Sequence, residues 1–186
     1  MQSVQQAAQG DFRAFEALVE RYQDRVQANC RYLSGSPTDA EDLTQEVFVK
    51  AFYGLRRFEG RASFHTWLRR IKANHCINFL KKKRGKTFLD LDAPTARESG
   101  ELRTQPMAEL NIAADAQRGL IRETLNAIPD SLRVPLVLRD MDGLAYREIA
   151  DELGLRLSAA KMRVKRGREM FRSVYSRLAG NGEEGE

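Results

Sequence analysis

Apolar residues recur every three or four positions in three stretches of the first half of the chain, the spacing of one buried face on an α-helix. The first stretch follows Asp11, which can cap a helix, and its inward positions are Phe15, Leu18, Val19, Tyr22 and Val26. A second helix is expected over about residues 38–57, after Gly35-Ser36-Pro37, with an apolar face of Leu43, Val47, Phe48, Ala51, Phe52 and Leu55. A third begins at Ser63 and ends near Lys83, with Phe64, Trp67, Leu68 and Ile71 facing inward. Strand-like alternation is absent from the sequence, so residues 1–85 are predicted to form a helical domain.

From Gly85 to about Pro106 the periodicity gives way to Thr, Asp, Pro, Glu, Ser and Gly, and we assign residues 86–110 to a flexible linker. Helical spacing resumes near Asn111, breaks at Pro129, and starts again at Ser131. Because proline lacks an N–H group, Pro135 leaves the boundary of this last helix open. We expect an all-α fold of two small domains, the second over residues 111–179, with a disordered tail at 180–186.

Two helical patterns meet at a glycine between Asp140 and Arg172. Residues 145–153 place Ile149, Ala150 and Leu153 on one face, and Gly154 follows, where a helix can end in a left-handed residue. Ser158 is expected to cap the next helix. One stripe of that helix is apolar: Ala160, Val164, Gly167, Phe171, Val174 and Leu178. A neighbouring row is basic: Lys161, Lys165, Arg168 and Arg172. This pattern is typical of a helix-turn-helix, whose second helix enters the DNA major groove; the alternative is a solvated basic helix.

Charge along the chain is uneven. The net charge is +5, yet residues 60–89 contain no acidic residue and nine basic ones: Arg61, Arg69, Arg70, Lys72, Lys81, Lys82, Lys83, Arg84 and Lys86. Phe58, Phe64 and Trp67 lie among them, with Asn74 and Asn78 one helical turn apart. Aromatic rings can stack on unpaired bases while basic side chains follow the phosphates, so this segment suits melting DNA. For any single aromatic residue, a place in the core remains the alternative.

The second predicted helix is acidic in its first turns, at Asp39, Glu41, Asp42 and Glu46, with Gln45 among them. Acidic groups there complement the positive end of the helix dipole. Asp42, Gln45, Glu46 and Val49 also share one exposed stripe, which would suit a basic protein surface. Both interpretations remain open from the spacing alone.

Catalytic and metal-binding patterns are missing from the sequence. Cys30 and Cys76 form no Cys-x-x-Cys motif and are expected to be reduced thiols. His65 and His75 accompany no ligand spacing, phosphate-binding loop or nucleophile motif, so we predict no enzyme, metal or cofactor. Residues 1–10 lack the apolar core of a signal peptide, and no apolar run could cross a bilayer. A cytoplasmic protein without membrane insertion is expected.

Three motifs together resemble the extracytoplasmic-function (ECF) sigma factors of bacteria. They are Asp39-Ala-Glu-Asp-Leu-Thr-Gln-Glu-Val-Phe, Phe64-His-Thr-Trp-Leu-Arg-Arg-Ile and Asp142-Gly-Leu-Ala-Tyr-Arg-Glu-Ile-Ala. The resemblance covers about residues 10–85 and 120–178 and implies that the two domains are sigma regions 2 and 4. It implies that core RNA polymerase is the main partner, bound through the β′ clamp helices and the β flap. An anti-sigma factor is a further partner expected of the family.

The resemblance also implies roles for particular residues. By this resemblance, the residues that contact the β′ clamp helices would be Asp42, Gln45, Glu46 and Phe48. Contacts with the −10 element fall to Phe58, Ser63, Trp67, Arg69, Arg70 and Asn74, where the loop 58–63 and Asn74 would hold a flipped base. Contacts with the −35 element fall to Arg147, Lys161, Met162, Arg163, Lys165 and Arg166. One departure matters: Ser158-Ala159-Ala160 stands where the family usually has Gly-Thr-Val, and Met162 where it has serine. Methionine cannot make serine's hydrogen bonds, so an apolar base preference is expected there.

These expectations describe an initiation factor that gives RNA polymerase its promoter specificity and helps to open the duplex. Its main rival is a stand-alone helix-turn-helix regulator that binds operator duplex. A second rival is an RNA-binding or nuclease-like enzyme, which the missing acid–base and metal residues disfavour.

Overall fold

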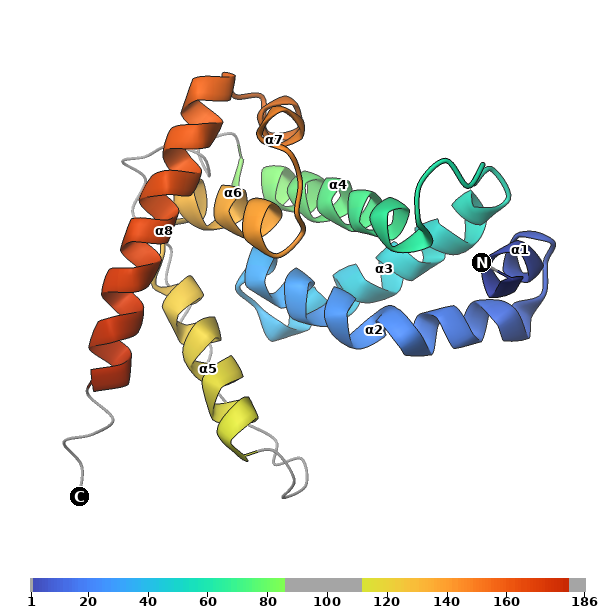
Figure 1. Ribbon diagram of the computed structural model, residues 1–186, viewed down its shortest axis with the longest axis horizontal. Coiled ribbons are helices and arrows are strands. Elements are labelled where there is room, and N and C mark those ends of the chain that lie inside the picture. The colour runs from blue at the N-terminus through green and yellow to red at the C-terminus, as the bar shows by residue number, and fades with distance from the viewer. Residues whose placement is uncertain (1, 86–111, 181–186) are drawn as a thin grey trace. The chain divides into compact units, whose positions relative to one another are not determined.

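The computed structural model describes residues 2–85 and 112–180, and every regular element in these ranges is a helix. Contacts divide the chain after Gly85 into two compact units, which are described separately below (Figure 1). The all-helical, two-domain prediction is therefore confirmed. The predicted linker, residues 86–110, and all but the first residue of the predicted tail, residues 181–186, lie outside the described residues.

The first unit consists of α1 (Gln2–Ala8), α2 (Phe12–Ser34), α3 (Pro37–Leu55) and α4 (Phe64–Arg84). α3 packs along α2, and α4 packs against both. Each apolar face turns toward this common core, whose most enclosed side chains include Leu33, Leu43, Val47, Leu55, Leu68, Ile77 and Leu80. The unit therefore leaves one outward face on α3 and another on α4.

Polar caps set the starts of three helices in this unit. Asp11 accepts hydrogen bonds from the backbone N–H groups of Arg13 at 2.9 Å and Ala14 at 3.2 Å, as the sequence predicts. Ser36 caps α3, so this helix begins at Pro37, one residue earlier than expected. Proline suits the first helical position because its missing N–H would have no partner there. Ser63 caps α4 by accepting from the Thr66 N–H at 3.1 Å.

The second unit consists of α5 (Ile112–Asn126), α6 (Asp130–Asp140), α7 (Tyr146–Leu153) and α8 (Leu157–Gly180). Figure 1 shows α8 as a long helix, and α5, α6 and α7 all pack against it. α6 is the centre of the unit, with every residue from 131 to 138 buried. It begins at Asp130 and contains Pro135, which settles the boundary that the sequence leaves open.

α8 crosses α6 very closely at Gly167. A Cβ atom on this glycine would lie 3.0 Å from the backbone oxygen of Leu132 and 3.2 Å from Cβ of Leu136. The predicted apolar stripe of α8 faces this contact: Ala160, Val164 and Val174 are buried with Gly167, while Phe171 and Leu178 are half-buried. Glycine allows this close approach, because a Cβ here would force neighbouring atoms to shift by a few tenths of an ångström.

The turn between α7 and α8 is two residues shorter than predicted. Gly154 ends α7 in the left-handed conformation, with φ 67°, and the Leu155 N–H donates to the Ala150 oxygen at 2.8 Å. α8 then begins at Leu157, and the Ala160 N–H bonds to the Arg156 oxygen. Ser158 is thus the second residue of the helix, and the prediction that it forms the cap is wrong. A backbone that is already helical cannot take the extended conformation of a cap.

Candidate nucleic-acid and protein interfaces

The outward face of α3 carries the residues that the sequence assigns to a protein partner. Asp42, Gln45, Glu46 and Val49 are all exposed and succeed one another along one side of the helix. The Glu46 carboxylate lies 2.5 Å from Nε2 of His75 on α4. Asp42 makes no ion pair with any residue that the structure describes, so its charge is directed to solvent.

A second ion pair links the start of α3 to α4. Lys83 Nζ lies 2.7 Å from Oδ2 of Asp39, whose side chain is largely covered. Asp39 therefore contributes less to the outward face than its place among the acidic residues suggests. The acidic face of α3 is held against α4 at two points, Asp39 and Glu46.

Phe48 does not lie on this outward face. Its side chain is only 7% exposed and belongs to the core of the first unit. A residue in this position supports α3 from beneath and cannot itself offer much surface to a partner. The helical spacing already places Phe48 with Leu55 and Val47 on the apolar side, although the family motif includes it.

Sequence reasoning missed an apolar continuation of the α3 face. Tyr53 is 74% exposed, and it follows Val49 by one helical turn. Phe12, at the start of α2, is 64% exposed and packs edge-on to Phe52 at a centroid distance of 6.3 Å. The outward face is thus acidic in its first half and aromatic in its second. Extending the stripe from Glu46 by intervals of three and four would have found Tyr53.

Three aromatic rings cluster where α4 begins. The Trp67 centroid lies 5.1 Å from that of Phe58 and 5.7 Å from that of Phe64. Phe64 is buried, whereas Phe58 and Trp67 are half-buried and the loop residues 59–63 between them are exposed. The indole also covers α3, because a Cβ on Gly54 would meet its Cζ2 atom at 3.1 Å. Phe64 is therefore a core residue, while Phe58 and Trp67 keep an accessible edge.

Fewer basic side chains of α4 are accessible than the sequence indicates. Arg70, Asn74, Asn78, Lys81 and Lys82 are exposed, and Arg69 is half-buried. Lys72 is only 1% exposed, so its inclusion among residues that follow phosphates is wrong. Its position explains the error: Leu68, Lys72, Cys76 and Leu80 follow one another at intervals of four, and all are buried.

On the second unit, the exposed residues of α8 near its start are Lys161, Met162, Lys165 and Arg166, and Arg147 is exposed on α7. All five are accessible to a partner, and four of them lie on the second helix of the helix-turn-helix. Arg163 differs, because it is half-buried and both Nε and Nη1 of its guanidinium are enclosed. The described position of Arg163 therefore does not favour a base contact.

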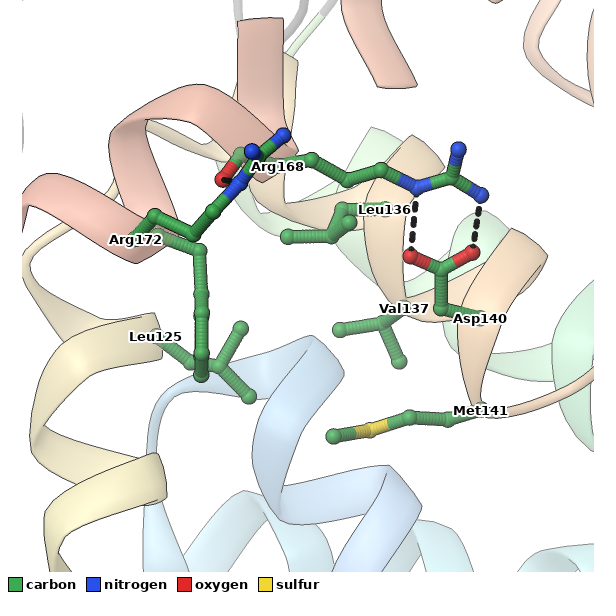
Figure 2. A pocket seen from close by; sticks show the side chains of 8 residues that line it. Leu125, Leu136, Val137, Asp140, Met141, Arg168 and Arg172 are labelled. Carbon is green, nitrogen blue, oxygen red and sulfur yellow. Dashed lines mark hydrogen bonds and ion pairs between the residues drawn. The ribbon is translucent and has the colours of Figure 1, made fainter. Parts of the chain in front are cut away.

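The predicted basic row of α8 ends early. Arg168 is bound by Asp140 through two hydrogen bonds, Nε to Oδ2 at 2.8 Å and Nη2 to Oδ1 at 2.6 Å (Figure 2). These bonds raise the pKa of Arg168 well above its ordinary value, so the guanidinium is charged whenever the unit is folded. Arg172 donates from Nε to the Arg168 oxygen at 3.4 Å. The sequence places Arg168 in a DNA-facing basic row, and this is wrong because its guanidinium is bound to Asp140.

The turn before α7 is held by two side chains. Arg139 Nη1 donates to the Leu144 oxygen at 2.7 Å, and its guanidinium lies 4.6 Å from the Tyr146 ring centroid. Glu148 Oε2 accepts from the Ala145 N–H at 2.8 Å at the start of α7. These contacts fix the angle at which α7 reaches α8, and so the position of Arg147 relative to Lys161 and Lys165.

A cavity of about 240 Å³ opens on the second unit between α5, α6 and α8. Its walls are apolar and come from Leu125, Leu136, Val137, Met141 and Phe171. Figure 2 shows the Arg168–Asp140 pair and Arg172 at its edge. An apolar hollow with charges at its rim suits the side chains of an amphipathic helix.

Membrane spans and metal sites are two further features that residues 2–85 and 112–180 could carry. No helix there has the length and apolar character that crossing a membrane requires. The same residues contain no group of three or more His, Cys, Asp or Glu side chains that could hold a metal ion.

Comparisons with known proteins agree with this arrangement. Residues 18–86 match the family model of sigma-70 region 2, and residues 118–171 match that of sigma-70 region 4. The ECF RNA polymerase sigma-E factor of Escherichia coli is 34% identical over 171 residues, which are 89% of this chain and 88% of that protein.

Two solved structures are also similar to this chain. CnrH, solved in complex with the cytosolic domain of CnrY, has a TM-score of 0.58 at 26% identity, over 94% of this chain and 95% of that one. The sigma factor RpoE of Bartonella quintana, solved with the anti-sigma factor NepR, has a TM-score of 0.59 at 23% identity, over 87% of this chain and 96% of that one; this likeness concerns the fold alone. The chain therefore belongs to the ECF family of RNA polymerase sigma factors, whose region 2 and region 4 promoter-recognition domains it carries.

Proposed function

We propose that this chain directs core RNA polymerase to promoters through three surfaces, which are the outward faces of α3, α4 and α8. Sigma factors are not enzymes, so binding alone must perform their work. The observation that carries the proposal is that the first unit presents an acidic face on α3 and a basic, asparagine-bearing face on α4. A regulator that only binds operator duplex needs neither face.

The α3 face binds the clamp helices of the polymerase β′ subunit through Asp42, Gln45 and Glu46. The support is that all three side chains are exposed on one side of a helix in a chain of net charge +5. Phe48 contributes by holding α3 in place from the core, not by contact. Val49 and Tyr53 extend the same surface with apolar area.

The α4 face captures the −10 element during opening. The exposed loop 59–63, with Phe58 and Ser63 at its ends and Asn74 on α4, receives a base flipped from the non-template strand. Trp67 lies at the edge of the opened duplex, and Arg69 and Arg70 approach its phosphates. Capturing an unstacked base offsets an opening cost of about a few kcal/mol, so melting needs no chemical energy.

The α8 face reads the −35 element in the major groove. Lys161, Met162 and Lys165 reach base edges, while Arg147 and Arg166 contact phosphates on either side. Met162 offers an apolar contact, which favours a thymine methyl group over a hydrogen-bonding base edge. Arg163 supports the fold of the helix and contributes less to readout than its sequence position implies.

The cavity of the second unit receives the β flap of the polymerase. An apolar side chain on a flap helix would occupy the space between Leu136, Val137 and Phe171, and its polar neighbours would meet Arg168 and Arg172 at the rim. Such binding would orient α8 toward upstream DNA. Binding of the β flap uses the cavity of the second unit, whereas the β′ contact uses the α3 face, so the two contacts can be tested separately.

An anti-sigma factor is a further partner that we propose for this chain. The support is indirect, because it comes from a related fold solved in a complex of this kind. A protein of this class would act by covering the α3 or α8 face. The place of action would be the cytoplasm, where it meets core polymerase and its inhibitor.

Transcription in a purified system tests the proposal. The chain is added to core RNA polymerase and a library of promoter fragments, and transcript starts are mapped. Defined starts that require the chain are the expected result. Specific binding to duplex without polymerase and without transcripts would instead identify an operator-binding regulator, and cleavage of nucleic acid would identify an enzyme.

A further inference from the structure

Two cysteines that are far apart in the sequence meet inside the first unit. Cys30 lies on α2 and Cys76 on α4, 46 positions later, and their Sγ atoms are 3.6 Å apart. Both are reduced, and both side chains are 0% exposed. This pairing could not be predicted from the sequence, because the two residues share no local motif.

The contact nearly meets the geometry of a covalent bond. A disulfide joins its sulfurs at about 2.0 Å, so the two atoms need to approach by about 1.5 Å. Rotation of the two side chains, with a small shift of α4 on α2, can supply such a movement. The two helices already pack together, so the two cysteines begin on neighbouring elements.

We propose that Cys30 and Cys76 form a reversible intrachain disulfide when the protein meets a peroxide. The first thiolate attacks an oxygen of the peroxide, so that an S–O bond forms and the O–O bond breaks. A sulfenic acid results, and the hydroxide that leaves takes up a proton as water. The second thiolate attacks the sulfenic sulfur, the S–S bond forms, and hydroxide leaves and takes up a proton as water. Two thiols lose two electrons and two protons, and hydrogen peroxide becomes two molecules of water.

Burial of the two sulfurs slows the first oxidation step but does not change the product of the reaction, the disulfide. Neither sulfur can be reached in the closed core, so the first step waits for a local opening of α4 from α2. Once one sulfur is oxidised, the second is its immediate neighbour, and ring closure is faster than attack by another peroxide molecule. A single buried cysteine has no such route and would stay reduced or oxidise further.

The bond would fix α4 on α2 at the middle of the first unit. Cys76 lies between the accessible residues of α4 that face DNA in the proposed function and the Lys83 contact with α3. The site itself does not depend on that function, since it rests on the distance and burial of two sulfurs.

The experiment uses the full chain, treated with hydrogen peroxide without denaturant and then with a thiol-alkylating reagent. We expect an intact-mass loss of about 2 Da, for the two hydrogens that leave, with no alkylation. A digest without reductant should contain one cross-linked species that joins the peptides bearing Cys30 and Cys76. Dithiothreitol should restore two alkylatable thiols, and the oxidised chain should remain monomeric and unfold at a higher temperature.

Cys30→Ser and Cys76→Ser serve as matched controls, with Cys30→Ala and Cys76→Ala in case a buried hydroxyl prevents folding. Each folded single variant should lose the 2 Da signal and the cross-linked species. Two results would overturn the proposal. One is a native chain that keeps both thiols at peroxide levels that oxidise it fully when unfolded; the other is oxygen addition at either cysteine without a cross-link.

Discussion

Arg168 in the middle of α8 donates two hydrogen bonds, of 2.8 and 2.6 Å, to the carboxylate of Asp140 at the end of α6. The pair lies at the edge of the apolar cavity, so this basic side chain of α8 is directed toward α6. A two-bond contact of this kind fixes direction as well as distance. It therefore helps to hold α8 at one angle on the rest of the second unit.

Replacing Asp140 tests this role. Asp140→Asn should lower the free energy of unfolding of the second unit by about 1 kcal/mol, because a partly exposed charged pair is lost while one hydrogen bond can persist. Urea unfolding of the full chain measures the change. Glu169→Gln is the matched control, since Glu169 approaches Lys165 only to 4.0 Å and both are well exposed. Equal losses in the two variants would contradict the assignment.

Reversing the charge of Asp42 tests the proposed polymerase face. Asp42→Arg should reduce association with core polymerase at least tenfold, a cost of about 1.4 kcal/mol, and leave the helical content unchanged, because the side chain is exposed. Co-purification and circular dichroism measure the two effects. Glu41→Arg reverses a charge at the neighbouring position and should bind almost normally. If both variants bind as wild type does, the docking face lies elsewhere.

Removing the Asn74 amide tests capture of the flipped base. Asn74→Ala should impair strand opening, measured by permanganate reactivity of exposed thymines, far more than it impairs polymerase binding. The reason is that the residue is exposed on α4, away from the α3 face. Asn78→Ala, one turn further from the 58–63 loop, should have the smaller effect. A parallel loss of opening and of polymerase binding in Asn74→Ala would count against a specific role.

The limits of the DNA-facing surface on α8 can be tested with two basic residues. Lys165→Ala should weaken binding of the holoenzyme to promoter DNA by about 1–3 kcal/mol, because Lys165 is exposed on the proposed readout face. Arg172→Ala should weaken this affinity less, since Arg172 lines the cavity and would act on DNA binding only through the β flap. Gel-shift titration at fixed salt compares them. A larger effect from Arg172 would restore the basic row that the sequence suggests.

A methyl group at Gly167 tests the close crossing of α6 and α8. Gly167→Ala should destabilise the second unit by about 1–3 kcal/mol, because the new Cβ would lie 3.0 Å from the Leu132 oxygen. Gly119→Ala on α5 is the control: its nearest neighbour would be Nη2 of Arg122 at 3.8 Å, so higher helix propensity should prevail. Thermal unfolding measures both. A neutral Gly167→Ala would show that the helices can separate at little cost.

The sequence was sufficient for the helices from α2 onward and for their apolar faces, because periodicity and caps are local properties, but it did not delimit α1. Asp11 and Ser63 cap where the pattern predicts, and Gly154 ends α7 as expected. Errors arose where a shift of one or two positions changes which side of a helix a residue lies on, or where the helix begins. Lys72 is an example of the first kind and Ser158 of the second. A positive charge is not a reliable sign of exposure when it occupies an apolar register.

Contacts between distant segments could not be predicted from the sequence. The Cys30–Cys76 contact, the Arg168–Asp140 pair and the rim of the cavity all join residues on different helices. Their formation depends on crossing angles that the local pattern does not contain. The roles of the site residues themselves came from the likeness of three motifs to a family, and the structure adds which of those side chains are accessible.

The bridges from Asp39 to Lys83 and from Glu46 to His75 have a mechanical consequence. In the proposed function α4 faces nucleic acid, and the same helix is ion-paired to two carboxylates of α3. A tilt of α4 would displace both carboxylates at once, so a captured strand on one side would alter how this unit fits the enzyme on the other. Substitutions in either helix should therefore be scored for both partners before a loss is attributed to one.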